Sequence, residues 1–326
     1  MSYAKIDLHL HLDGSINPEW GWKTALKKGI VEPTCTFEEY YDSLYTKKEG
    51  AKPMSIFDIP ISVMQTHDEL YEATYNLIKK LSEKKMLYAE IRFASQQHCL
   101  EGLTQYEVLE AVVDGWKQAS IDFPNVKTGI INCMMHKGEN AAFNMKENME
   151  TIEVTKAFLG NGVVGLDLAG YENTGPFMDY APLFEKAREY GIPYTIHAGE
   201  MGLGEHVPDA IAMGAHRIGH GILCVQNDAW LQQVIDTQIP LEVCVTSNCG
   251  FGRNYAAHPV RKLIRSGVKV TINTDNMMFS RTDLAYEHAQ LKDIGVTDEE
   301  LKQCLYNAVD AAFCDEETKE WIRKQL

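Results

Sequence analysis

The sequence predicts an α/β protein with the (β/α)₈ architecture of a TIM barrel. Eight short, apolar, β-rich runs alternate with amphipathic helical patterns along the 326 residues. Most of these runs are near-continuously hydrophobic, which is typical of parallel strands covered on both faces. A doubly wound open sheet is the alternative, and the absence of a GxGxxG turn after the first strand disfavours it. Without repeats or linkers, residues 1–326 are expected to form a single domain.

The strand predictions follow the order of the chain. Each run is bounded by turn residues or by a helical pattern, and each has the length of an ordinary strand. The predicted strands are Lys5–Leu10, Leu87–Phe93, Lys127–Cys133, Val163–Leu168, Tyr194–His197, Arg217–Gly221, Leu241–Val245 and Lys269–Asn273.

Helix boundaries are predicted by capping signals between these strands. Thr104-Gln-Tyr-Glu107 and Thr297-Asp-Glu-Glu300 both have the spacing of a capping box. Pro259 is expected in the first turn of a helix that ends at Gly267. Similarly, Gly160 or Gly162 is expected to end the helix before the fourth strand.

One connection is far longer than the others. Residues 14–66, between the first and second strands, are too many for a simple βα loop. We interpret this stretch as helical insertions that cover the barrel mouth as a lid.

Composition restricts the partners and the location. A net charge of −15 disfavours a nucleic-acid partner, which usually needs a basic patch. No apolar run approaches the length of a membrane span, and no signal-peptide core is present, so we expect a cytoplasmic protein with no membrane partner. The eight cysteines are scattered without CxxC pairs and are expected to be reduced thiols. The oligomeric state is not predicted.

Polar residues occur where several strands end. His9 and His11 project on the same face of the first strand, while His197, His220 and Asp275 close later strands. Taken singly, each has a structural explanation, such as a hydrogen-bonded buried histidine, a tight turn between glycines or a helix cap. Because the strand ends of a barrel meet at one rim, their joint occurrence favours a shared site.

The residue types at this rim indicate a metal-dependent hydrolase. The three imidazoles of His9, His11 and His197 with the carboxylate of Asp275 suit Zn²⁺ with one position left for water, although Fe, Co and Mn accept the same ligands. Such a metal lowers the pKa of water towards neutrality. His220 could take the proton or stabilise the nucleophile, and Glu200 could act as a general acid. No function is assigned to His67, His98, His136, His206, His216, His258 and His288.

Five motifs give the pattern a specific resemblance. They are His9-Leu-His11-Leu-Asp13-Gly14, Gly165-Leu-Asp167-Leu-Ala-Gly170, His197-Ala-Gly-Glu200, Arg217-Ile-Gly-His220-Gly and Asn273-Thr-Asp275. In this order, from the first strand to the last, the chain resembles the adenosine deaminase family of metal-dependent amidohydrolases. The resemblance implies a (β/α)₈ barrel with one Zn²⁺ per chain, bound by His9, His11, His197 and Asp275. It also implies hydrolytic deamination of adenosine and 2′-deoxyadenosine to inosine and ammonia, in purine salvage.

The resemblance also implies roles for individual residues. Glu200 would donate a proton to purine N1, while His220 and Asp275 position the nucleophile that attacks C6. The substrate would be a small purine nucleoside in contact with His11, Asp13, Gly170 and Asn276. Of these residues, Asp13 would meet the ribose, the Gly170 N–H purine N3 and Asn276 purine N7.

Two departures from the family pattern leave the substrate open. Asn276-Met277 follows Asp275 where Asp-Pro is widely found, and Val245 occupies a position where proline is common. An asparagine amide can also donate to a purine nitrogen. The alternatives are therefore a deaminase of another 6-aminopurine, such as adenine or a modified nucleoside, and a catalytically silent barrel that binds nucleosides or a protein. Retention of every ligand and of the proton donor favours an enzyme.

Overall fold

The computed structural model describes residues 4–44, 54–172, 175–201 and 203–326. Its strands form two parallel four-stranded sheets, in the orders β1-β2-β3-β4 and β5-β6-β7-β8. Isolated parallel bridges, Leu166 with Tyr194 and Leu10 with Asp275, join the sheets at both seams. The predicted barrel is therefore confirmed. The strands are β1 Ile6–His11, β2 Tyr88–Phe93, β3 Lys127–His136, β4 Val163–Gly170, β5 Thr195–Ala198, β6 Arg217–His220, β7 Leu241–Val243 and β8 Val270–Ile272.

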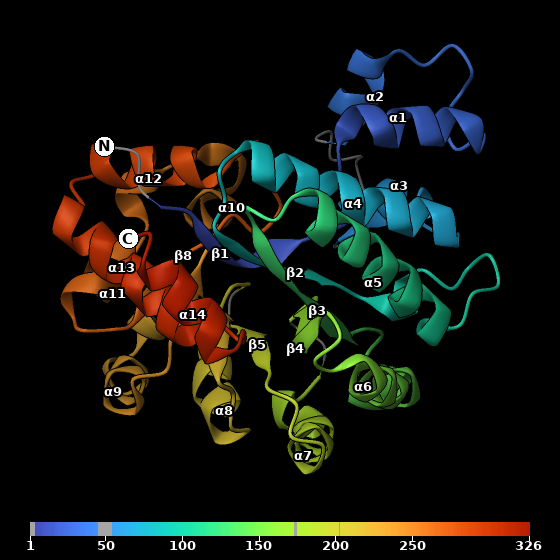
Figure 1. The fold of residues 1–326 in the computed structure, drawn as a ribbon. Coiled ribbons are helices and arrows are strands. Elements are labelled where there is room, and N and C mark those ends of the chain that lie inside the picture. Colours follow the sequence, from blue (N-terminus) through green and yellow to red (C-terminus); the bar gives the residue numbers. More distant parts are fainter. Residues whose placement is uncertain (1–3, 45–53, 173–174, 202) are drawn as a thin grey trace.

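Helices surround the strands, while α1 and α2 lie apart from that ring (Figure 1). None of the helices in the described ranges is long and apolar enough to cross a membrane. The helices are α1 Pro18–Lys27, α2 Phe37–Ser43, α3 Asp58–Ser62, α4 His67–Glu83, α5 Gln105–Asp122, α6 Met145–Phe158, α7 Ala181–Glu189, α8 His206–Ala212, α9 Asp228–Thr237, α10 Val245–Cys249, α11 Val260–Arg265, α12 Leu284–Asp293, α13 Asp298–Ala311 and α14 Glu316–Arg323.

The capping signals work as the sequence predicts. Both Thr104 before α5 and Thr297 before α13 form complete capping boxes, so the first turns of these helices have their N–H groups satisfied. Pro259 differs slightly, because it is the N-cap residue of α11 and not its first helical residue. Gly160 and Gly267 follow the ends of α6 and α11 with φ values of +79° and +85°, which favour glycine.

The predicted insertions between the first two strands are also confirmed. Helices α1, α2 and α3 precede α4, and residues 45–53 of this stretch lie outside the described residues. Phe57, in the short 3₁₀ turn before α3, packs edge-to-face on Phe279 with ring centroids 4.9 Å apart. Both rings line the cavity at the strand ends, so the insertion forms part of its wall.

The barrel interior is more polar than the sequence predicts. On β1, Ile6 and Leu8 pack outward in an apolar cluster with α13 residues. Inside, Arg92 and Arg217 pair with carboxylates that are likewise fully buried. These charged residues of the strands therefore occupy inward-facing positions, where they pair with one another because none can reach water.

Candidate metal centre and active site

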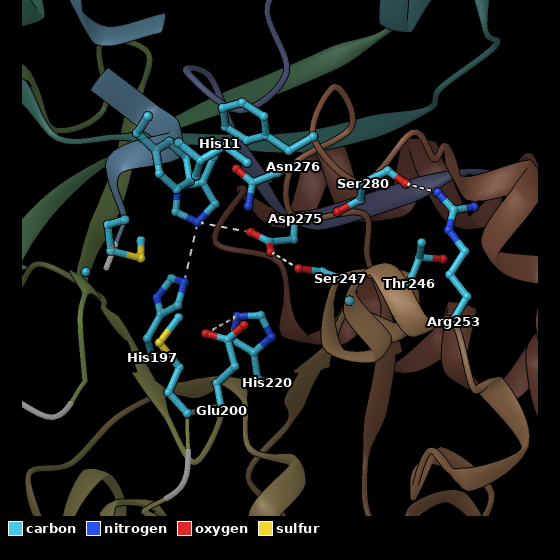
Figure 2. A pocket seen from close by; sticks show the side chains of 17 residues that line it. His11, His197, Glu200, His220, Thr246, Ser247, Arg253, Asp275, Asn276 and Ser280 are labelled. Atoms are coloured by element: carbon cyan, nitrogen blue, oxygen red, sulfur yellow. Dashed lines mark hydrogen bonds and ion pairs between the residues drawn. The ribbon is translucent and has the colours of Figure 1, made fainter. Parts of the chain in front are cut away.

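Four predicted metal ligands converge at the carboxyl ends of the strands. His9 and His11 come from β1 and His197 from β5, while Asp275 follows β8. The Nε2 atom of His11 lies 3.4 Å from both His197 Nε2 and Asp275 Oδ1 (Figure 2). Nε2 of His9 is 3.6 Å from the same Asp275 oxygen. Four donor atoms from three strand ends thus face one point.

The spacing of these atoms fits a divalent cation such as zinc. A tetrahedral zinc ion with bonds of about 2.0–2.1 Å separates its ligand atoms by roughly 3.4 Å. Nε2 of His9 is fully buried and has no hydrogen-bond partner, a costly arrangement that a metal would resolve. His9, His11 and His197 also form a group whose ligand atoms lie within 4.8 Å of one another.

Carboxylates behind two of the histidines fix their tautomers. His9 Nδ1 donates to Glu242 Oε2 at 2.8 Å, and His197 Nδ1 donates to Asp167 Oδ2 at 2.9 Å. Each ring then keeps a lone pair on Nε2, directed into the site. Burial lowers the pKa of His9, as does the charge of Arg92. For His197, burial is outweighed by the Asp167 carboxylate, which raises its pKa.

A single arginine joins these two carboxylates. Arg92 Nη1 donates to Asp167 Oδ2, and Nη2 donates to Glu242 Oε2, both at 2.9 Å. These are the same oxygens that accept the protons of His197 and His9. One guanidinium on β2 therefore connects the supports of two metal ligands that are 188 positions apart in the chain, with both carboxylates held ionised.

The backbone at the rim is held in a sparsely populated conformation. Asp275 and His220 have φ values of +60° and +61°, which few non-glycine residues adopt. The Asp275 N–H donates to the His9 carbonyl, and the His11 N–H donates to the Asp275 carbonyl, each at 2.8 Å. Ser247 Oγ donates to Asp275 Oδ2 at 2.5 Å. The neighbouring imidazoles of His9 and His11 outweigh burial at Asp275, so its pKa is well below the ordinary value.

Glu200 has the position and the acidity of a proton donor. It follows β5, its side chain is 19% exposed, and Oε2 lies 3.6 Å from His220 Nε2. Burial and the negative charge of Asp275 raise the pKa of Glu200 to about 7. Burial lowers the pKa of His220 to about 4, so that imidazole is neutral near pH 7. A carboxylic acid and a neutral imidazole therefore stand together beside the metal ligands (Figure 2).

The loop that carries Glu200 is anchored by another carboxylate. Glu172, after β4, accepts the backbone N–H groups of Gly199, Glu200 and Met201 and the Nδ1–H of His206. These hydrogen bonds outweigh burial and lower the pKa of Glu172 to about 2. The position of the acid is thus set by the neighbouring strand.

The remaining predicted residues line two adjoining cavities of about 310 and 70 Å³. Gly170 borders both, Asn276 borders the larger, and Asp13, which is 5% exposed, borders the smaller. Asn276 depends on Gly14, because a Cβ there would meet Asn276 Oδ1 at 1.7 Å. The structure therefore brings together every site residue that the sequence predicts.

Several residues of the site escaped prediction. Asp167 and Glu242 are the single charges of β4 and β7, and Arg92 shares β2 with Glu90, so these charges within apolar runs are the signal that the sequence offers. Ser247 lies in the short helix α10, and Glu172 lies after the fourth strand, where the sequence places it without giving it a role.

The short helix α10, which carries Ser247, is supported by a buried acid. Glu287 of α12 accepts Thr246 N–H at 3.2 Å and Thr282 Oγ1–H at 2.6 Å, with no cation paired to it among these contacts. Its side chain is fully buried, and burial raises its pKa from 4.5 to about 7. The folded state therefore favours the protonated acid.

We expect Glu287→Gln to change the pH dependence of stability. Because the folded-state pKa is raised, stability in the native protein is lost as pH rises from about 4.5 through 7. This loss reaches about 3 kcal/mol above pH 7. Glutamine cannot ionise. The free energy of unfolding of the variant, measured with urea, should therefore rise relative to that of the native protein as the pH is raised from 5 to 8. If the unfolding free energies of the two proteins changed with pH in the same way, the raised pKa of Glu287 would be contradicted. Glu317→Gln, at an exposed position, is the control.

A parallel barrel whose strand ends present three imidazoles, a carboxylate and a neighbouring acid belongs to the amidohydrolase class of metal-dependent hydrolases. The family model described as adenosine deaminase matches residues 4–326. The chain belongs to the adenosine deaminase family, as its motifs indicate.

Comparisons with individual proteins agree with this membership. Adenosine deaminase of Haemophilus ducreyi is 36% identical, covering 97% of this chain and 94% of that protein. Adenosine deaminase of Clostridium botulinum strain Okra is also 36% identical, and the match covers 99% of this chain and 96% of that protein. The fold matches adenine deaminase from Arthrobacter aurescens with a TM-score of 0.87 at 22% identity, covering 99% and 98% of the two chains. It also matches an amidohydrolase from Burkholderia ambifaria with bound Zn, with a TM-score of 0.85 at 24% identity and coverage of 98% and 88%.

Proposed function

We propose that this protein is a zinc-dependent adenosine deaminase. It would convert adenosine to inosine, and 2′-deoxyadenosine to 2′-deoxyinosine, with release of ammonia. One observation carries the proposal: Glu200 and His220, with Oε2 and Nε2 3.6 Å apart, line the same cavity as His11, His197 and Asp275, three of the four candidate metal ligands. The named relatives and the zinc bound in a fold neighbour support the activity and the metal. Because β1, β5 and the segment after β8 all contribute ligands, we treat residues 1–326 as one functional domain.

The proposed chemistry divides among the residues of the rim. A bound zinc ion would lower the pKa of a water molecule and so supply the nucleophile. Glu200, with its pKa near neutrality, would protonate purine N1 and so make C6 electrophilic. Asp275, held by Ser247, and His220 would direct the oxygen towards C6, from which ammonia leaves. His11 and His197 would remain fixed as ligands throughout.

The cavity linings fit a nucleoside. Asp13 is a buried carboxylate that borders the small cavity, where a ribose hydroxyl can form a hydrogen bond with it. At the rim, the Gly170 N–H would serve purine N3 and the Asn276 amide purine N7. Asparagine needs no raised pKa to donate this hydrogen bond, so it can replace the aspartate of the common pattern.

We expect purified, zinc-loaded protein to deaminate adenosine rapidly, measured as loss of the adenosine absorbance band. Adenine lacks a ribose for Asp13, and AMP brings a phosphate towards that carboxylate. Their kcat/KM should therefore be at least about 10²-fold lower. Metal analysis should find about one zinc per chain. Turnover of adenine or AMP in place of adenosine would show that the proposed substrate is wrong. If none of the three compounds were deaminated, a binding protein would be the better interpretation.

A further inference from the structure

A chain of hydrogen bonds behind His220 begins at a backbone group. Val260 N–H, at the start of α11, donates to His258 Nδ1 at 3.1 Å. His258 Nε2 lies 3.4 Å from Asn248 Oδ1, and Asn248 Nδ2 lies 3.0 Å from His220 Nδ1. Both histidines are nearly inaccessible to solvent, with exposed fractions of 1% for His220 and 7% for His258. We call the His258–Asn248–His220 series the relay.

The backbone donor fixes every proton in the relay. Burial lowers the pKa of His258 to about 4, so its ring is neutral and has one N–H. Since Nδ1 accepts from Val260, that proton is on Nε2 and is donated to Asn248 Oδ1. The opposite amide orientation would require His258 to accept at both nitrogens, which a neutral imidazole with one proton cannot do. Asn248 therefore donates its Nδ2–H to His220 Nδ1.

We infer that Asn248 and His258 are positioning residues that hold His220 as its Nε2–H tautomer. His220 Nε2 is the nitrogen that faces Glu200, so the proton points into the space between Glu200 and the metal ligands. In that tautomer, neutral His220 cannot accept a proton at Nε2. It donates a hydrogen bond to the oxygen that attacks C6. Of the two roles considered for His220, it therefore stabilises the nucleophile and does not take its proton. The inference rests on the proposed function only for the identity of that oxygen.

The first test reads the tautomer and needs no activity. In zinc-loaded protein with ¹⁵N-labelled histidine, long-range ¹H–¹⁵N correlation spectra should show His220 protonated at Nε2 and bare at Nδ1. His220→Asn identifies the signal by its loss. A proton on Nδ1 in the native protein would overturn the inference, whether or not adenosine is deaminated.

The second test uses an isosteric change. Asn248→Asp places a carboxylate that can only accept at His220 Nδ1, so His220 must carry a proton there. We expect kcat to fall about 10²- to 10⁴-fold, as when a catalytic histidine is held in the wrong tautomer, with KM nearly unchanged. A variant that keeps native kcat and the native His220 spectrum would overturn the inference.

Variants at His258 separate positioning from packing. His258→Phe removes the proton donated to Asn248 and should lower kcat about tenfold, while His258→Gln keeps an N–H donor and should recover most of it. His216→Phe is the matched control, because His216 Nδ1 also accepts a backbone N–H, from Tyr194, but at the amino end of the barrel. Equal losses for all three variants would show a merely structural role and contradict the inference.

Discussion

Replacing Glu200 by glutamine is expected to lower kcat for adenosine by about 10²- to 10⁴-fold, the range that general acid catalysis supplies. Glutamine has nearly the same shape and can still donate a hydrogen bond to purine N1. It cannot transfer a proton, however, so C6 would not become electrophilic as the oxygen attacks. Because Glu200 is not among the four candidate metal ligands, zinc content and KM should change little.

Two measurements make this result decisive. Metal analysis of Glu200→Gln should still give about one zinc per chain, which separates loss of the acid from loss of the metal. Glu205→Gln, an exposed position a few residues further along, should retain native turnover. Native kcat in Glu200→Gln would refute the proton-donor role. Equal losses in both variants would instead indicate general disruption of the loop.

The path of the chain and the rim residues could be predicted from the sequence. The strands have β-rich apolar runs, and capping boxes at Thr104 and Thr297 mark helix starts through local hydrogen bonds alone. His9 and His11 are two positions apart, so strand geometry places them on one face without knowledge of the fold. The positions of His197 and Asp275 then follow from the rule that barrel strand ends share a rim.

The supports of the site could not be predicted in the same way. Arg92, Asp167 and Glu242 lie on three different strands, and only closure of the barrel shows that they touch. Neither the lone charges of β4 and β7 nor the Glu90–Arg92 spacing of β2 identifies a partner on another strand. His258 shows the same limit, because its role depends on the orientation of one amide, that of Asn248, and on a backbone N–H. Local patterns thus locate groups that face the substrate, whereas three-dimensional contacts locate the groups that orient them.

The largest expected effect on the metal comes from Arg92→Lys. Lysine keeps the positive charge, but its ammonium is a compact point and cannot reproduce the planar fork that meets Asp167 and Glu242 together. At least one carboxylate would lose its hydrogen bond from residue 92 and would be held less firmly. The ring of the histidine that this carboxylate orients would then be less well fixed. Changes at such supporting groups usually weaken metal binding 10- to 100-fold, and we expect that increase in the Kd for zinc, measured by competition with a chelator.

Arg217→Lys is the matched control for this experiment. Arg217 is equally buried, but it donates to the other oxygen of Glu242, and its further partners are Glu90 and the Ala311 carbonyl in place of Asp167. Its replacement should lower the free energy of unfolding by a similar amount, because both changes disturb buried ion pairs. Zinc affinity, however, should stay within a few-fold of the native value, since His9 would still donate to Glu242 and His197 to Asp167. If both variants lost zinc equally, overall stability of the barrel interior, and not the bridge made by Arg92, would determine metal binding.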